Sequence, residues 1–423
     1  MMKRNSPRAI AASMSIHSMT LPFASHSTAR ARVPGWLLFA PLLVALLLAA
    51  CSAPNPGAPA ATQVNNAPRL TPARWADLPG WESDDLHEAW PAFRLSCHVL
   101  SKQPAWSGVC ARAESVADDS ASLHRFFEDN FEPRRVENRQ GVDTGLITGY
   151  YEPLLSGSRT RHPPYTVPLY GVPHDLIDVE LSSEYPELSA MRLRGRLEGN
   201  KLVPYASRAE IEDWPVAREG AIVFVDDPIA ALFMEVQGSG RIRLIDGDPA
   251  ASVIRLSYAD QNGHPYRAIG RWLVEHEELP LSAVSMQSIT AWAHAHPERA
   301  REMLDSNPSY VFFKESAIAD PALGPQGALG VALTPLRSLA VDGRVIPLGS
   351  PVFLSTHWPD GIEPLARLMM AQDTGGAIAA SAERPVRADL FFGMGDAAAA
   401  WAGTMKQQGQ LWVLVPIGKS TLP

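Results

Sequence analysis

Short apolar runs that end at glycine or proline dominate this chain from residue 146 onward. Runs such as AIVFVDD and ALFMEVQGSGRIRLID have the length and the β-branched content of strands. The 37 prolines and 30 glycines disfavour an all-helical bundle. With 46% hydrophobic and 19% charged residues, the composition is that of a globular protein. We therefore expect a mainly β protein with some helices.

Helical and β-rich stretches follow one another along the folded part. The spacing of apolar residues predicts helices near 118–131, 265–278 and 282–306, and the block at 146–258 is typical of a small β domain. Six more strand candidates follow residue 309, with one helix expected between an N-cap at Asp396 and Gly409. Six short strands with few helices favour a small closed barrel over an open parallel sheet.

The N-terminus predicts export. Residues 1–50 hold five basic and no acidic residues, and WLLFAPLLVALLLAA (36–50) has the length of a signal-peptide core. The run ends in Leu-Ala-Ala-Cys51, which resembles a bacterial lipobox, and Ser52 in place of Asp favours the outer membrane. An ordinary secreted protein and a retained anchor are the alternatives. Residues 51–71, rich in Pro, Ala and Asn, are expected to form a flexible tether.

Charge and cysteine content narrow the chemistry. The formal net charge of −8 becomes −13 without residues 1–50, which argues against nucleic acid as a partner. An oxidising periplasm makes a disulfide between Cys97 and Cys110 plausible, with two buried thiols as the alternative. His294 and His296 on one helix point to opposite sides and cannot share a metal. We expect no metal and no organic cofactor.

Three aspartates stand beside glycine turns in the C-terminal β block. Asp342 lies in AVDGRVIPLG, Asp373 in AQDTGGAI and Asp389 in RADLFFGMG. In a strand, Asp389 and Phe391 face one way and Leu390 and Phe392 the other. An aspartate that opens so apolar a strand is partly desolvated, which raises its pKa and makes it a usable proton donor. A structural aspartate in a turn is the alternative, most evenly balanced at Asp342.

At these residues the chain resembles a known family. DTGGAI, the Asp-Leu pair of ADLFFGMG, and VDGRVIPLGS are similar to the 3D domain, named for three aspartates. Upstream, TGYYEP, SRAEI, MEVQGSGRIRL, NGHPYRAIGRWL, SMQSI and NPSYVFFK resemble the membrane-bound lytic murein transglycosylase A family, in the family's order. The resemblance runs from about Gly141 to Pro416. It implies a double-psi β-barrel domain (72–145 and 259–423, with the 3D region at about 330–416), an inserted β domain (146–258), and a glycan groove between them.

The resemblance also implies the activity. The family cleaves the β-1,4 bond between N-acetylmuramic acid and N-acetylglucosamine in peptidoglycan and leaves 1,6-anhydro ends. Asp389 takes the position of the single catalytic acid/base, and Asp373 and Asp342 match the supporting carboxylates. Substrate contacts are expected from two tyrosines, one glutamine, one serine and four glycines: Tyr150, Tyr151, Gln237, Gly238, Ser239, Gly240, Gly375 and Gly376.

The expected partners are glycan strands, the outer membrane through the lipid on Cys51, and other cell-wall enzymes. Two departures from the family pattern keep alternatives open. Ala379-Ala380 stands where Lys-Gly is common, and Phe392 stands where a hydrogen-bonding residue is common. A two-carboxylate hydrolase and a non-catalytic peptidoglycan-binding lipoprotein are the alternative functions.

Overall fold

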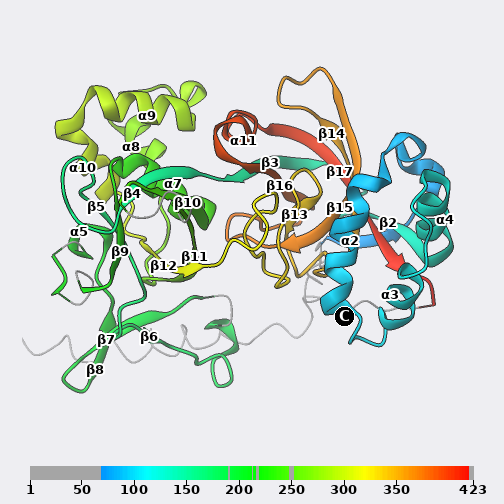
Figure 1. Cartoon of the computed structure of the whole chain (residues 1–423), viewed down its shortest axis with the longest axis horizontal. Coiled ribbons are helices and arrows are strands. Elements are labelled where there is room, and N and C mark those ends of the chain that lie inside the picture. The colour runs from blue at the N-terminus through cyan, green and yellow to red at the C-terminus, as the bar shows by residue number, and fades with distance from the viewer. Residues whose placement is uncertain (1–67, 189–190, 212, 216–218, 247–251, 419–423) are drawn as a thin grey trace, which may run out of the picture. The chain divides into compact units, whose positions relative to one another are not determined.

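The computed structural model describes residues 68–418 apart from 189–190, 212, 216–218 and 247–251 (Figure 1). The predicted signal peptide, the lipidation site Cys51 and most of the predicted tether lie outside the described residues. Within the described part, no helix has both the length and the apolar character needed to cross a bilayer.

The first sheet closes on itself. Its six ring strands, in spatial order, are β17 (Lys406–Pro416), β14 (Pro351–His357), β15 (Pro364–Asp373), β13 (Ser338–Val341), β16 (Val386–Met394) and β3 (Gly145–Glu152). β3 also pairs with the start of β17, which completes the ring, and β2 (Phe131–Glu137) and β1 (Arg69–Pro72) extend the sheet beyond β17. The mainly β fold is confirmed, while the double-psi connection of the barrel remains a prediction.

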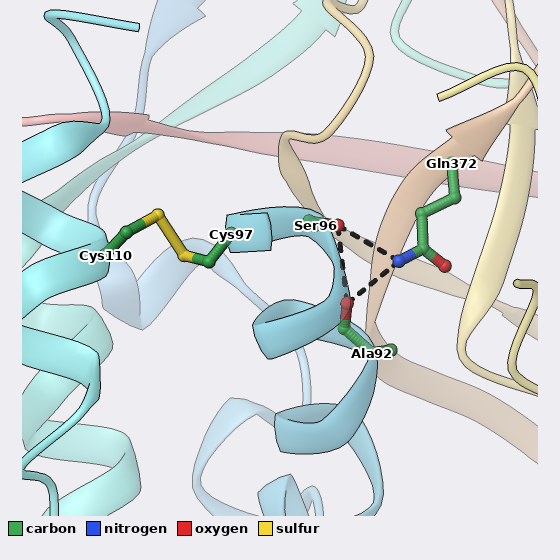
Figure 2. Close-up of a disulfide and its surroundings, with 5 residues drawn as sticks. All are labelled: Ala92, Ser96, Cys97, Cys110 and Gln372. Carbon is green, nitrogen blue, oxygen red and sulfur yellow. Dashed lines mark hydrogen bonds between the residues drawn. A yellow bond between two sulfur atoms is a disulfide. The ribbon is translucent and has the colours of Figure 1, made fainter. Parts of the chain in front are cut away.

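Alternation along the strands divides this barrel into two faces. Leu390 and Phe392 of β16 pack with Leu339 and Val341 of β13 in the apolar interior. Part of the outer face is covered by three helices: α2 (Leu86–Leu100), α3 (Ser107–Ala113) and α4 (Ser120–Asn130). Asp85 and Asp119 cap α2 and α4 by accepting backbone N–H bonds, as N-cap residues do. Cys97 of α2 and Cys110 of α3 form a disulfide (Figure 2).

A second sheet holds most of the remaining strands. Its six members, in spatial order, are β12 (Val311–Ser316), β11 (Val253–Gln261), β10 (Ser239–Leu244), β4 (Leu154–Ser158), β9 (Ala221–Val225) and β5 (Val167–Tyr170). A small sheet joins β6 (Ile177–Asp178), β7 (Arg194–Glu198) and β8 (Lys201–Pro204). The helices of this part are α5 (Arg208–Ile211), α7 (Pro228–Gln237), α8 (Ile269–Glu275), α9 (Met286–Ala295) and α10 (Pro297–Asp305). α7 packs on the sheet, and α8 to α10 pack around α7.

The predicted limits of the inserted β domain, 146–258, differ from the strand pairing. β3 belongs to the barrel, the limit at 258 cuts through β11, and β12, expected among the barrel strands, pairs with β11. By pairing, the insertion runs from about 153 to 316. The pattern of a short apolar strand predicts that it joins a sheet but not which of two sheets it joins, and this is the physical reason for the difference.

Two helices also differ from the prediction. The run ALFMEVQ is not a strand but most of α7, because the Asp227 side chain accepts the N–H bonds of Ile229 and Ala230 at the helix start. The C-terminal helix, α11 (Gly395–Ala402), begins after Met394, so Asp396 lies in its first turn and is not its cap. Gly409 lies in β17, where a Cβ would come within 2.6 Å of Ile147.

A buried ion cluster stands where the chain leaves the barrel. Glu152, at the end of β3, is fully buried and accepts hydrogen bonds from Arg241 Nε at 2.8 Å and from Arg255 Nε at 2.6 Å. Both guanidinium groups also donate to the carbonyl of Leu323, on the segment that returns to the barrel. The two arginines of the second sheet therefore join the outgoing chain, through Glu152, to the returning chain, through the Leu323 carbonyl.

Candidate active site

Strand register places Asp389 and Asp373 on β16 and β15, the two strands that flank β13. Asp389 of β16 lies opposite Ala340 of β13, and Ala340 lies opposite Asp373 of β15. Ala340 and Phe391 belong to a small outer cluster, separate from the barrel interior, so Asp389 shares the outer face with them, as the alternation predicts.

Asp389 is desolvated without an ion-pair partner. Thr148, its neighbour on β3, donates its hydroxyl to Asp389 Oδ1 at 2.8 Å. Arg387 Nη1 donates to the Thr148 hydroxyl at 2.9 Å, and no cation among the described residues forms an ion pair with Asp389. Burial raises the pKa of Asp389 to about 6, against the lowering effects of Thr148 and Arg387 and with a further raising effect from Asp373. Asp389 can therefore carry a proton near neutral pH and release it.

Asp373 is fixed by three donors. The backbone N–H groups of Thr374 and Ala328 donate to Oδ1 at 2.9 and 3.0 Å, and the Tyr150 hydroxyl donates to Oδ2 at 3.1 Å. Burial raises the pKa of Asp373, and the three hydrogen bonds oppose that rise. This carboxylate is held rigidly beside Asp389, as an orienting or electrostatic group would be.

Tyr150 has a different environment from the one predicted. Its ring packs on Phe391 at a centroid distance of 5.2 Å and is buried, so neither face is free to stack on a sugar. Burial and the nearby charges of Asp373 and Asp389 raise the pKa of Tyr150 well above its usual value. The phenol therefore stays protonated and acts as the donor that orients Asp373.

Asp342 does not join this pair, because among the described residues the hydrogen-bond partners of its carboxylate are Arg344 and Ala380. It is buried just beyond β13, where Arg344 Nη2 donates to Oδ2 at 2.6 Å and the backbone N–H of Ala380 donates at 3.0 Å. Burial would raise the pKa of Asp342, but these hydrogen bonds outweigh it and hold the pKa below its usual value. The carboxylate fixes the 380 loop. Since Ala380 contributes its backbone, the departure at Ala379-Ala380 leaves this contact intact.

The predicted substrate contacts of the α7–β10 turn form a buried joint. Gln237 accepts the Tyr151 N–H at 3.0 Å, and Gly238 ends α7 at φ +80°. Ser239 is buried, and a Cβ on Gly240 would lie 2.4 Å from Met234 Sδ. These residues connect α7 to β3 and β10, so their surroundings differ from those of an open sugar-binding surface.

Gly375 and Gly376 lie in the exposed loop after Asp373. The carbonyl of Gly375 accepts the N–H of Ile378, which closes a turn, and a Cβ on Gly376 would meet no atom within 4 Å. Gly376 is therefore the open member of the pair.

Sequence reasoning missed one residue of the site and one separate pocket. Thr148 stands two residues before Tyr150, and strand alternation alone would have placed it on the same face. A pocket of about 470 Å³ was not predicted, because it joins segments distant in sequence. It is lined by Tyr151, Pro153, Leu154, Leu155, Asp227, Ala230, Phe233, Met286, Gln287, Thr290, Ala291 and Asp396. Tyr151 thus lines this pocket. Asp389 is not among the residues that line it.

Comparison with known proteins identifies the family. The MltA specific insert domain matches residues 146–314, and the 3D domain matches residues 337–415. Membrane-bound lytic murein transglycosylase A of Escherichia coli (strain K12) is 32% identical over 302 residues, which are 70% of this chain and 72% of that protein. The chain belongs to the membrane-bound lytic murein transglycosylase A family.

Solved structures of the family agree with this assignment. MltA from Neisseria gonorrhoeae superposes with a TM-score of 0.72 at 36% identity, over 83% of this chain and 93% of that one. Escherichia coli MltA with bound chitohexaose superposes with a TM-score of 0.59 at 25% identity, over 79% and 90%. The insert-domain match begins at 146, where the inserted domain was predicted to begin, and ends at 314, inside β12, as the strand pairing indicates.

Proposed function

We propose that Asp389 is the single acid/base of this enzyme. As a member of its family, the chain is a peptidoglycan lytic transglycosylase, a lyase that acts on a polysaccharide. The observation that carries the assignment of Asp389 is a desolvated carboxylate with a pKa raised to about 6 and no paired cation among the described residues. Ordinary glycosidases use two carboxylates, whereas one suffices when the sugar supplies its own nucleophile.

The reaction follows from one proton moving out and back. Protonated Asp389 donates to the glycosidic oxygen as the C1–O bond of N-acetylmuramic acid breaks. The resulting carboxylate accepts the proton of the muramic acid 6-hydroxyl, whose oxygen bonds to C1 and closes the 1,6-anhydro ring. An internal nucleophile gains from proximity and needs no bound water. The Thr148 hydroxyl, which donates to Asp389 Oδ1, holds the acid in one orientation.

Asp373 has a supporting role in this proposal. Its negative charge contributes to the raised pKa of Asp389, and Tyr150 with two backbone N–H groups holds it in place. A two-carboxylate hydrolase with Asp373 as its water-activating base is the second candidate, because the two groups lie on either side of Ala340, on the strands that flank β13.

The fate of water separates these two mechanisms. Digestion of purified sacculi in ¹⁸O-water should yield anhydro products without label at C1, about 18 Da lighter than hydrolytic products, because no water is added. One ¹⁸O atom per cleaved bond would overturn the transglycosylase mechanism. Binding to sacculi without release of soluble muropeptides would instead support the non-catalytic alternative. Against that alternative, Phe392 packs in the barrel interior, so the departure there does not change the surroundings of Asp389.

We further propose that the enzyme is anchored in the outer membrane, facing the periplasm, by a lipid on Cys51. The curated relatives are named as membrane-bound, and the lipobox-like sequence before Cys51 carries the proposal. Cys51→Ala should move the protein from the detergent phase to the aqueous phase in detergent partitioning. Equal partitioning of the variant and the wild type would contradict lipidation.

A further inference from the structure

We propose that Gln372 is a positioning residue: it anchors an irregularity in β15 that turns Asp373 toward Asp389, and helix α2 is its support. This role rests on the proposed function, because it acts through Asp373. It assigns a purpose to a fully buried amide that makes no contact with Asp389 or Asp373 side chains.

The irregularity is a one-residue shift in strand register. Leu339 of β13 lies opposite Ala371, but the next residue, Ala340, lies opposite Asp373. Gln372 is therefore the extra residue of β15. In an unbroken strand, Asp373 would share the side of Ala371, which packs in the barrel interior. An inserted residue changes the side on which the following side chain emerges, a device common beside active sites.

The Gln372 amide is fully hydrogen-bonded on both sides. Its Nε2 donates to the carbonyl of Ala92 at 2.8 Å and to Ser96 Oγ at 3.0 Å, as Figure 2 shows. Its Oε1 accepts the Ser338 hydroxyl at 2.6 Å. The backbone carbonyl of Gln372 also accepts the N–H of Leu329, next to Ala328, which donates to Asp373. The extra residue is thus fixed between α2, β13 and the loop that holds Asp373.

Helix α2 carries both acceptors of the Gln372 amide on successive turns. Ser96 precedes Cys97, whose disulfide to Cys110 ties this turn of α2 to α3 (Figure 2). Pro91 lies inside α2 and has no N–H to donate, so the helix lacks one backbone hydrogen bond just before Ala92. The disulfide therefore stabilises the part of α2 on which the position of Gln372 depends.

The test is a double-mutant cycle between Gln372 and Asp373. Gln372→Leu keeps the bulk of the side chain and removes its hydrogen bonds. It should lower kcat on sacculi by about 10- to 100-fold, as expected for a misplaced catalytic group, with little change in the half-saturating substrate concentration. In an Asp373→Asn background the same change should have almost no further effect. In the Gln372→Leu single variant, Asp373 should turn away from Asp389, and its charge should no longer raise the pKa of Asp389. The alkaline limb of that variant's pH–rate profile should therefore move to lower pH.

Thr356→Val is the matched control. It removes another buried hydrogen bond of the barrel, from Thr356 Oγ1 to the carbonyl of Gln408, and should leave kcat and the pH profile of the folded enzyme unchanged. If Gln372→Leu does not fold, Ser96→Ala removes one of the three bonds and should shift the pH profile in the same direction by less. Additive losses in the cycle, or an unshifted profile, would overturn the positioning role. A different result would contradict the proposed function itself: in that case the Asp389→Asn variant would retain activity.

Discussion

Strand β3 passes one fully buried and one partly buried carboxylate with opposite surroundings. At its end, Glu152 is fully buried and lies between the guanidinium groups of Arg241 and Arg255. Beside its middle, the Asp389 carboxylate accepts a hydrogen bond from the Thr148 hydroxyl and forms no ion pair with a described residue. Burial alone therefore assigns no role to a carboxylate. Direct ion pairs make Glu152 a structural group, whereas Asp389, which forms none with the described residues, can exchange a proton.

The largest effect is expected at Asp389, the one of these two carboxylates that forms no ion pair with a described residue. Asp389→Asn should lower kcat by more than about 10⁴-fold, above the usual effect of one general acid, because the same residue serves both proton transfers. Binding to sacculi should be nearly unchanged, since Asn keeps the shape. Rates of muropeptide release and a sacculus pull-down measure the two effects. A variant within about 10-fold of wild type would mean that the acid lies elsewhere.

A substitution at Glu152 should lower the free energy of unfolding. Glu152→Gln leaves the buried Arg255 and the partly buried Arg241 without their carboxylate, and breaking a buried ion pair costs about 3–5 kcal/mol. Denaturant unfolding measures the loss. The matched control is Glu315→Gln, which removes an exposed ion pair with Arg159 and should cost less than about 1 kcal/mol. Equal losses in the two variants would show that the Glu152 cluster does not join the chain segments as described.

Asp373→Asn should give an intermediate loss of kcat, about 10- to 100-fold, because the residue orients and polarises but does not transfer the proton. Product analysis should still find only anhydro ends. A loss as deep as that of Asp389→Asn, together with labelled reducing ends in the wild type, would make the two-carboxylate hydrolase the better mechanism.

The smallest expected effects concern pH. With the pKa of Asp389 at about 6, the rate should fall about tenfold per pH unit well above pH 6, because the protonated acid is required. The folded-state pKa lies above the ordinary value of 3.8, so this group's contribution to stability is full below about pH 4 and is lost as the pH rises through 6. Asp389→Asn should therefore be slightly more stable than wild type at pH 7, and not at pH 4. Thermal unfolding at both pH values checks the sign.

The sequence pattern predicted the features of the barrel that depend on neighbouring residues alone, namely where strands lie and which face each side chain occupies. The strands that became β14 to β17 are apolar runs with clear ends, and alternation correctly separated Asp389 and Phe391 from Leu390 and Phe392. The oxidising compartment pointed to the Cys97–Cys110 disulfide that the structure contains. The apolar strand after Asp389 favoured it as the proton donor among the three aspartates, and the motif resemblance then assigned it the acid/base position.

Long-range partners set the limit of prediction. Nothing local in Val311–Ser316 indicates that this strand pairs with β11 and not with the barrel. The register shift at Gln372 depends on acceptors in α2, some 280 residues earlier in the sequence. Tyr150 was expected to meet sugar and instead donates to Asp373, because the contacts of a buried phenol depend on what packs above it.

Ring closure has a kinetic consequence. Thr148 and Asp389 are 241 residues apart, and the whole second sheet is inserted between their strands. Contacts across such separations form late in folding, because the chain entropy of closing the loop must be overcome before any pairing compensates for it. The second sheet, built largely from nearer segments, can form without them. A partly folded chain therefore lacks the acid's complete surroundings, and recovery of glycan cleavage during refolding reports closure of the barrel and not collapse of either domain alone.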